Sequence, residues 1–423
     1  MPFFSSFTGS FTSGRRKPIS IGVGGGGGGG QSVDFTTLTL QTTIDNPNPV
    51  EPETSDLFGI GISLSGTTVL IGAMGEDETV SPDDSGRNAG KAYLYDITDG
   101  SLLHTIDNAD ADGNPISDNF GRYVAIDGDY FIISGTTENS FSGAVYVYDT
   151  NTATLLRTIT NPNAYGTSDN DYFGIGLDLS GTTAIVGAWQ EDDAGGTSSG
   201  KVYVFDVTDG SLLQTFDNPN SYGTSADDRF GLNSATDGTL AIVSAHYEDE
   251  AGHDRSGKAY IFNVSTGALV HTLNNPNNDS AAGAIGDQFG QFVDIDGDYA
   301  VASSIREANN TGIVYVFNTS DGSLARTIQN PSGTSGDTFG DSVRLQGNYL
   351  LVGASGASGN AGKAYLFNVT DGSLLQTIDN PNADPAAITD LFGTPCDIDN
   401  EYIVFGTAFE GGGGKAYAFK GSA

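Results

Sequence analysis

The spacing of oxygen-bearing side chains in one segment suggests a metal site. Asp110, Asp112, Asn114 and Asp118 place carboxylate or amide oxygens at positions 1, 3, 5 and 9 of this segment, which is the alternation by which a loop wraps calcium. Pro115 stands where calcium loops use a glycine for their sharp turn, and Asp118 also belongs to a repeated turn motif. The segment makes calcium the one candidate cofactor, and a metal-free turn is the alternative interpretation.

The sequence signatures of catalysis are missing from the chain. No His-Glu-x-x-His, Gly-x-Ser-x-Gly or Walker motif occurs, and the glycine run 24–30 lacks the strand and helix that frame a phosphate cradle. Glycoside chemistry needs one paired carboxylic acid with a raised pKa, and no such pair stands out among 53 acidic residues. We therefore expect a protein that is not an enzyme, with a lyase or hydrolase as the second alternative.

The charge balance limits the partners of the chain. Its 423 residues carry 53 Asp or Glu against 17 Lys or Arg, a formal net charge of −36. Such a surface repels phosphate backbones and anionic membranes, so we expect no nucleic-acid partner. Cys396 is the one cysteine, which excludes an intrachain disulfide framework, and no apolar run approaches the ~18 residues of a membrane span.

A motif of Asp, any residue, Phe and Gly recurs seven times. Its phenylalanines lie 50 to 62 residues apart, at Phe58, Phe120, Phe173, Phe230, Phe289, Phe339 and Phe392. Each copy precedes an alternating run, a two-residue turn and a second apolar run, which is typical of a β-hairpin. A third strand begins at a glycine, as in Gly200-Lys-Val-Tyr, and a fourth ends in Asn-Pro. Each unit therefore contains four strands.

The order of these strands at the two ends of the repeat region predicts a closed ring. The fourth-strand pattern appears at 36–46 before any first strand, whereas the last repeat stops on a third strand at 414–419. Pairing of these two segments would complete the last sheet and close seven four-stranded sheets into an all-β, seven-bladed β-propeller. We expect two parts, an arm at 1–33 and a propeller at 34–423.

The combination of Asp-x-Phe-Gly, of Gly-Ala at the end of the second strand and of Gly-Lys-Ala-Tyr in the third resembles bacterial and phage FG-GAP repeats over about 34–423. FG-GAP repeats also build the ligand-binding propeller of integrin α subunits, where some blades hold calcium between the first two strands. Here that turn has two residues, as at Asp127-Gly128, so we expect no calcium there. The fold itself does not assign a function.

The connections between strands fall on two faces. Those from strand two to strand three, and from strand four to the next strand one, share a face on which we expect long acidic loops; we call it the long-loop face. A glutamate column follows strand two in six blades, with Ala357 in the other, and lies near a lysine column at the start of strand three. These columns predict exposed cross-strand ion pairs. The repeated Asp before Phe-Gly is interpreted as a turn-capping acceptor.

One column on the long-loop face differs in every blade, as recognition requires. It includes Met74, Trp189 and His246 and, with Tyr247, Arg306 and Phe409, predicts a binding face for a receptor protein or a glycan. Aromatic and polar groups of this kind suit stacking on sugars or anchoring a protein loop. Structural packing is the alternative interpretation.

The arm at 1–33 follows none of the repeat. It combines aromatic residues, cations and a run of seven glycines; the residues expected to anchor it are Phe3, Phe4, Phe7, Phe11, Arg15, Arg16 and Lys17. The glycine run is typical of a flexible tether. The opening segment resembles the first residues of marine phage structural proteins, which implies a peptide that fixes a projecting domain to a particle.

These observations predict a virion structural or attachment protein, displayed through 1–33 on a larger assembly. The alternative is an extracellular bacterial adhesion or carbohydrate-binding propeller. The expected location is accordingly the virion, or the extracellular space and cell surface.

Overall fold

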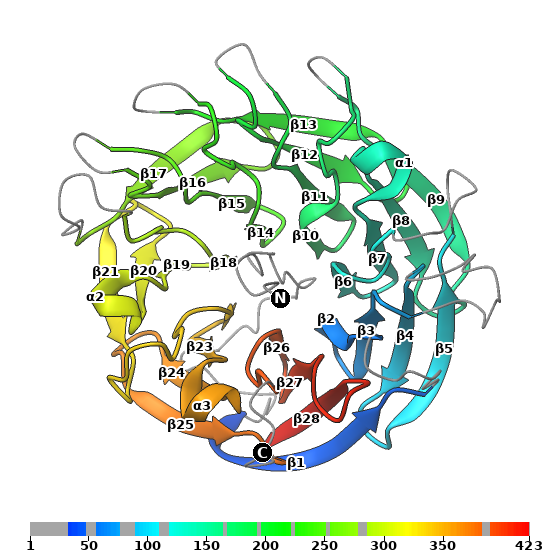
Figure 1. The fold of residues 1–423 in the computed structure, drawn as a ribbon, viewed down its shortest axis with the longest axis vertical. Coiled ribbons are helices and arrows are strands. Elements are labelled where there is room, and N and C mark those ends of the chain that lie inside the picture. The colour runs from blue at the N-terminus through cyan, green and yellow to red at the C-terminus, as the bar shows by residue number, and fades with distance from the viewer. Residues whose placement is uncertain are drawn as a thin grey trace, which may run out of the picture.

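The computed structural model describes residues 33–47, 56–76, 89–109, 118–163, 167–192, 196–220, 225–250, 254–277, 286–382 and 390–422. The strands in these ranges form seven antiparallel sheets of four strands each. The sheets stand around a common centre like the blades of a propeller (Figure 1). The chain is therefore an all-β, seven-bladed β-propeller, as the repeat predicts.

Blades one to six each contain four strands that are consecutive in the chain. The strands of blades one to three are β2 (Phe58–Ser65), β3 (Thr68–Ala73), β4 (Lys91–Asp96) and β5 (Ser101–Asp107); β6 (Val124–Asp127), β7 (Tyr130–Gly135), β8 (Ala144–Asp149) and β9 (Leu155–Thr160); and β10 (Ile175–Ser180), β11 (Thr183–Ala188), β12 (Lys201–Asp206) and β13 (Leu212–Asp217). The strands of blades four to six are β14 (Ser234–Thr236), β15 (Leu240–Ala245), β16 (Lys258–Asn263) and β17 (Leu269–Asn274); β18 (Val293–Asp296), β19 (Tyr299–Ser304), β20 (Ile313–Asn318) and β21 (Leu324–Gln329); and β22 (Val343–Gln346), β23 (Tyr349–Ala354), β24 (Lys363–Asn368) and β25 (Leu374–Asp379).

Blade seven joins the two ends of the repeat region. It contains β26 (Cys396–Asp399), β27 (Tyr402–Thr407), β28 (Lys415–Ser422) and, as its outer strand, β1 (Asp34–Asp45). β1 runs antiparallel to β28, with Ile44 opposite Ala416 and Asp45 opposite Lys415. Two buried side chains anchor the strand, because Phe35 packs among residues of blades six and seven and Ile44 among residues of blades seven and one. The predicted closure of the ring by the first strand is confirmed.

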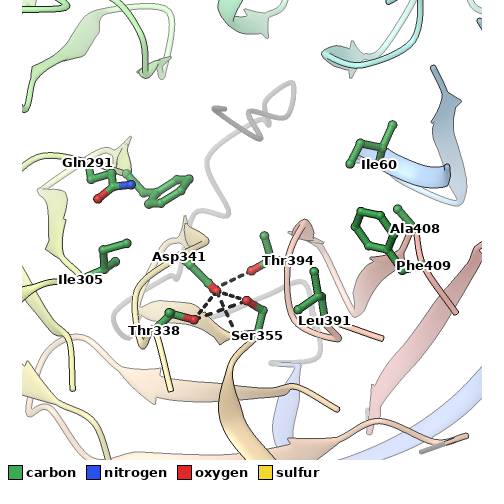
Figure 2. Close-up of a pocket in the computed structure, with 11 residues that line it drawn as sticks. Ile60, Gln291, Ile305, Thr338, Asp341, Ser355, Leu391, Thr394, Ala408 and Phe409 are labelled. Carbon is green, nitrogen blue, oxygen red and sulfur yellow. Dashed lines mark hydrogen bonds between the residues drawn. The ribbon is translucent and has the colours of Figure 1, made fainter. Parts of the chain in front are cut away.

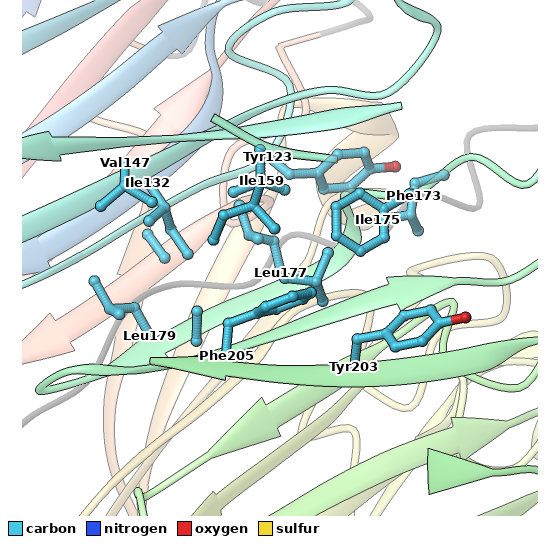
Figure 3. Close-up of a cluster of buried hydrophobic side chains, with 14 of the residues drawn as sticks. Tyr123, Ile132, Val147, Ile159, Phe173, Ile175, Leu177, Leu179, Tyr203 and Phe205 are labelled. Carbon is cyan, nitrogen blue, oxygen red and sulfur yellow. The ribbon is translucent and has the colours of Figure 1, made fainter. Parts of the chain in front are cut away.

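The hydrophobic core lies between adjacent blades. Figure 3 shows one such layer, in which Ile132 and Val147 of blade two meet Leu177 and Phe205 of blade three. The inner strands alternate apolar residues toward both neighbouring sheets, so most of their positions are buried. The fourth strands are mostly exposed and bury little more than one residue each, as Phe216 does in β13. The ring therefore depends on contacts between blades as much as within them.

A close backbone contact joins each blade to the next. The glycine that precedes the third strand in blade three, Gly200, has φ +83°, and a Cβ built there would stand 2.0 Å from the carbonyl oxygen of Phe230 in blade four. The same contact recurs between the other pairs of blades; the glycines are Gly90, Gly143, Gly257, Gly312, Gly362 and Gly414, each against the phenylalanine of the next Asp-x-Phe-Gly motif. The repeated glycine and phenylalanine of the motif thus form the joint between blades.

The repeated aspartate has a specific partner in every blade. Its carboxylate accepts a hydrogen bond from the side-chain amide of the asparagine that ends the preceding fourth strand, at 2.7–3.1 Å; the pairs are Asn46–Asp56, Asn108–Asp118, Asn161–Asp171, Asn218–Asp228, Asn275–Asp287, Asn330–Asp337 and Asn380–Asp390. The repeated aspartate is thus an acceptor in the turn, as predicted, and its partner is an asparagine that a proline follows in six of the seven blades. This pair closes the connection from each blade to the next.

The connections on the long-loop face are not uniformly long. In blades two, five and six the second and third strands are joined through the short segments α1 (Glu138–Phe141), α2 (Glu307–Asn310) and α3 (Ala357–Asn360). Residues inside them have positive φ, such as Asn139 at 50° and Ser140 at 61°, so these are left-handed turns. The expectation of long acidic loops in every blade is therefore wrong for these three. The described residues contain no helix long and apolar enough to cross a membrane.

Candidate functional site

The centre of the long-loop face is built from a strained position in the repeated motif. In all seven blades the variable residue of Asp-x-Phe-Gly has a left-handed backbone with φ of 55–58°; these residues are Leu57, Asn119, Tyr172, Arg229, Gln288, Thr338 and Leu391. Such a conformation disfavours side chains by about 1–2 kcal/mol. This position brings Tyr172 and Arg229 against Trp189, and Thr338 against Ser355, in the column that ends strand two.

The glutamate column lies beneath this position and is buried rather than exposed. Glu191 accepts hydrogen bonds from the Tyr203 hydroxyl at 2.8 and 2.7 Å. The same Tyr–Glu contact occurs in five other blades; the pairs are Tyr93–Glu76, Tyr146–Glu138, Tyr260–Glu248, Tyr315–Glu307 and Tyr417–Glu410. Each of these glutamates is at most 3% exposed. They are scaffold residues that fix the loop above them to the third strand.

The predicted Glu–Lys pairs are therefore wrong in most blades. Lys201 instead pairs with Asp217, which stands directly opposite it on the fourth strand. Three other blades repeat this contact; the pairs are Lys91–Asp107, Lys363–Asp379 and Lys415–Asp45. Lys258 alone among the described lysines approaches its glutamate, with 3.9 Å between Nζ and Glu248 Oε1. The reason is geometric, because the lysine and aspartate share a register position whereas the glutamate reaches the tyrosine two residues along.

Aromatic rings and guanidinium groups gather on blades three and four. The guanidinium carbon of Arg229 lies 4.9 Å from the centre of the Trp189 ring and 3.9 Å from that of Tyr247. Arg255 lies 4.5 Å from the same Tyr247 ring. Tyr172 continues the group, with its ring centre 5.9 Å from that of Trp189. Cation–π contacts of this kind hold a guanidinium in a fixed orientation. We call these five residues, together with His246, the arginine–aromatic cluster.

His246 lies fully buried inside this cluster. Its ring centre is 4.6 Å from that of Tyr247, and neither ring nitrogen has a hydrogen-bond partner in the part of the chain that the structure describes. Burial lowers the pKa of His246 to about 3, and the positive charges of Arg229, Arg306 and Arg255 contribute to the decrease. The imidazole is therefore neutral at physiological pH, with one N–H donor and one free acceptor.

This burial predicts a specific pH dependence. Above pH 6.5 the imidazole is neutral in both the folded and the unfolded chain, and its contribution to stability is complete. As the pH falls below 6.5, only the unfolded chain takes up the proton, so this contribution is lost at up to about 1.4 kcal/mol per pH unit. Replacement of His246 by Gln should therefore reduce the slope of the unfolding free energy against pH between pH 6.5 and 4. The reduction corresponds to the uptake of up to one proton fewer on unfolding. Denaturant unfolding at several pH values measures this; equal slopes for the two proteins would contradict it.

A pocket of about 160 Å³ lies across the ring from the cluster, among residues of blades one, five, six and seven. Figure 2 shows its polar floor, where the Asp341 carboxylate accepts hydrogen bonds from the hydroxyls of Thr338 at 2.8 Å and Thr394 at 2.5 Å, and from Ser355. Burial raises the pKa of Asp341 despite these bonds. The walls are largely apolar, with Ile60, Phe292, Ile305, Leu391, Ala408 and Phe409. With both its oxygens occupied by donors, Asp341 is a structural carboxylate.

The structure places the predicted binding residues at several points of the ring. Trp189, His246 and Tyr247 come together in the arginine–aromatic cluster, and Arg306 acts on His246 through its charge. Phe409 lines the pocket on the other side of the centre. Met74 lies half-buried in blade one and belongs to neither group.

The other predicted sites fall largely beyond the described ranges. Asp110, Asp112 and Asn114 of the calcium segment lie outside them, and Asp118 is held by Asn108. Over the described residues, no group of three or more His, Cys, Asp or Glu side chains could hold a metal ion. The anchor residues lie outside the described ranges as well; they are Phe3, Phe4, Phe7, Phe11, Arg15, Arg16 and Lys17.

Arg229, Arg255, Tyr172 and Asp341 were not predicted as site residues. Arg229 and Tyr172 stand at the variable position of Asp-x-Phe-Gly, which lies next to the column that was predicted. Comparison of this position across the seven blades would have indicated them, because it changes from leucine to arginine while its neighbours stay constant. Arg255 lies in a connection without a repeat, so the sequence alone carries no signal for it.

The fold and the repeated contacts define the class of this chain as a seven-bladed β-propeller of four-stranded blades. The FG-GAP repeat matches residues 49–95, 163–205, 222–262 and 327–367. These four matches confirm the resemblance to FG-GAP repeats noted in the sequence. A search of curated proteins found no match to the chain.

Proposed function

We propose that this chain is a non-enzymatic attachment protein that recognises its target with the arginine–aromatic cluster of the long-loop face. The observation that carries the proposal is the gathering of Trp189, Arg229 and Tyr247 around one another on that face. Tryptophan, tyrosine and arginine are the residues that most often dominate the energy of binding interfaces. The preferred setting is a virion, on which the chain is displayed through residues 1–33.

The contrast between scaffold and cluster supports recognition. The Asn–Asp pair and the glycine–carbonyl joint recur in every blade, and the Tyr–Glu contact recurs in six. The cluster occupies positions that change from blade to blade. Its residues are therefore not part of the repeated contacts that hold the blades together. Variable side chains held by a rigid scaffold are the usual basis of specific binding.

The geometry of the ring centre supports a role without catalysis. A general base must be able to accept a proton from a substrate. The Asp341 carboxylate already accepts hydrogen bonds from Thr338, Ser355 and Thr394. His246 lies fully buried with a pKa lowered to about 3.

An adhesion assay with the full chain tests the proposed function. Beads coated with the wild type are compared with beads that carry Trp189→Ala and Arg229→Gln, over a panel of bacterial cells. The matched control carries Arg326→Gln, since Arg326 is an exposed arginine of the outer strand β21 that donates to the carbonyl of Thr370. We expect the wild type and the control to adhere to the same cells and the cluster variant to lose at least tenfold in retention. Equal retention of the cluster variant, or no adhesion by the wild type, would overturn the proposal.

The role of residues 1–33 separates the virion from the alternative of a bacterial adhesion or sugar-binding propeller. A chain that lacks these residues should keep its unfolding midpoint and its adhesion but fail to sediment with particles produced by its source. Their seven glycines, three cations and four phenylalanines support this assignment, in line with a tether that ends in a docking peptide. Co-sedimentation of the shortened chain at the wild-type level would favour the bacterial alternative.

A further inference from the structure

The arginine–aromatic cluster contains more hydrogen-bond donors than the described residues can satisfy. The indole N–H of Trp189 is buried without an acceptor, as is the imidazole of His246. Within the described ranges Arg229 and Arg306 have no carboxylate within ion-pair distance, and Arg255 has only Asp254 at 4.0 Å. Buried donors without acceptors are rare in folded proteins, because leaving them unpaired destabilises the fold. The cluster is therefore complementary to an external acceptor.

The exposed part of Arg229 indicates the shape of that acceptor. The rings of Trp189 and Tyr247 cover the guanidinium from the sides on which they stack, so its N–H edge is the part left for a ligand. Such an edge matches the two oxygens of one carboxylate. Burial lowers the pKa of Arg229 from its ordinary value, and Arg255 contributes to the decrease, which agrees with a positive group that has lost water without gaining a full counter-charge. A bound carboxylate would supply that charge.

The surroundings indicate what carries the carboxylate. The rings of Phe141, Tyr172 and Trp189 follow one another with 5.4 and 5.9 Å between their centres, and Phe141 is 42% exposed. Aromatic faces in succession suit the flat C–H faces of sugar rings, which bury apolar surface while their hydroxyls remain in water. The net charge of −36 repels a dense polyanion at long range. A single acidic sugar in an otherwise neutral oligosaccharide meets both conditions.

We propose that the arginine–aromatic cluster binds an oligosaccharide with an isolated carboxylate, which Arg229 and Arg255 receive while Trp189, Tyr172 and Phe141 stack on the neighbouring sugar rings. This inference deepens the proposed function and rests on it, because it names the chemistry of the attachment site. An acidic peptide would pair with the arginines equally well. It would not supply flat sugar rings to stack on Phe141, Tyr172 and Trp189. The oligosaccharide is therefore the ligand that uses both the arginines and the adjoining aromatic rings.

The single tryptophan of the chain provides the test. Trp189 is the only tryptophan in 423 residues, so tryptophan fluorescence of the full chain, excited at a wavelength that tyrosine does not absorb, reports on the cluster alone. Sialyllactose is the probe with one carboxylate, lactose is the matched neutral probe, and an acetylated triglutamate peptide is the acidic probe without sugar rings. We expect saturable change with sialyllactose, at least tenfold weaker binding of lactose and of the peptide, and at least tenfold weaker binding of sialyllactose by Arg229→Gln.

Two controls keep the outcome interpretable. Arg326→Gln should bind like the wild type, and the unfolding midpoint of Arg229→Gln shows whether that variant folds. If it does not fold, Arg255→Gln takes its place, with the same expected loss. Equal binding of lactose and sialyllactose, tighter binding of the peptide, no saturation with any probe, or wild-type binding by the folded variant would each overturn the inference.

The adhesion assay separates this inference from the proposed function. Adhesion that requires the cluster, combined with no binding of sialyllactose, means that the site is real and its ligand is of another class. If the cluster variant adheres as well as the wild type, the proposed function itself is rejected.

Discussion

Replacement of Gly200 by alanine is expected to destabilise the ring by about 3–5 kcal/mol, the largest effect of any single change considered for this chain. Gly200 has φ +83°, and an added Cβ would stand 2.0 Å from the carbonyl oxygen of Phe230. That oxygen belongs to the backbone of the next blade and cannot rotate away. The two blades must therefore separate or the chain must change its path, and either movement disturbs the core between them.

A matched glycine isolates the contribution of the close contact. Gly181 also has positive φ, +58°, but a Cβ there would meet no atom within 4 Å. Gly181→Ala should therefore lose only the about 1–2 kcal/mol of the left-handed conformation. Urea unfolding midpoints of the two variants measure the difference. Similar midpoints would contradict the interpretation of the repeated glycine as the joint between blades.

Replacement of Ile44 by alanine is the second large change, with an expected loss of about 2–4 kcal/mol. Ile44 lies in β1, is 4% exposed and packs against the inner residues of blades seven and one. It is one of two side chains, with Phe35, that bury the outer strand of blade seven. Its loss should weaken the closure of the ring and lower the midpoint of thermal unfolding.

The same strand provides the control for this change. Leu40 lies four residues earlier and is 46% exposed, so Leu40→Ala should change the unfolding free energy by less than about 0.5 kcal/mol. Equal effects of the two substitutions would mean that β1 does not close the ring. A deletion of residues 34–45 extends the comparison and should destabilise more than either substitution.

The fold could be predicted from the sequence because its signals are local and repeated. Two-residue turns such as Gly66-Thr67 fix each hairpin, and the fourth-strand pattern before the first repeat indicates the closure by β1. The sequence shows the glycine before the third strand seven times. It does not show the close contact that requires a glycine, because the carbonyl in that contact belongs to the next blade. A contact between blades therefore appears in the sequence as a repeated residue, but the sequence does not indicate which residue of the next blade it contacts.

The partners of the lysine column show what a comparison within the chain can add. Lys91 and Asp107 stand opposite each other, and so do Lys201 and Asp217. In blade two the same register holds Ala144 and Thr160, which are both uncharged. Charge at this position varies together on the two strands in every blade except the fourth, where Lys258 stands opposite Asn274. The glutamate column does not vary together with the lysine column in this way. The contact of each glutamate with a tyrosine depends on the course of the connection from strand two to strand three.

The candidate site was predicted in part. The variable column at the end of strand two includes Trp189 and His246, because change against a constant background indicates recognition. The variable residue inside Asp-x-Phe-Gly was overlooked, although it supplies Arg229. Which of the seven variable side chains meet is decided by the length and course of the connections, as for Arg255. Such geometry depends on the folded loops and has no local sequence code.

Recognition through the arginine–aromatic cluster is tested by locating where a target contacts the ring. Hydrogen–deuterium exchange of the full chain, free and bound to the surface that it adheres to, locates the contact by peptide. We expect protection of the backbone around Trp189, Arg229 and Tyr247, and unchanged exchange in the short turns of the opposite face, such as Gly128-Asp129. Protection of those turns or of the outer strands, with no change around Trp189, would contradict it.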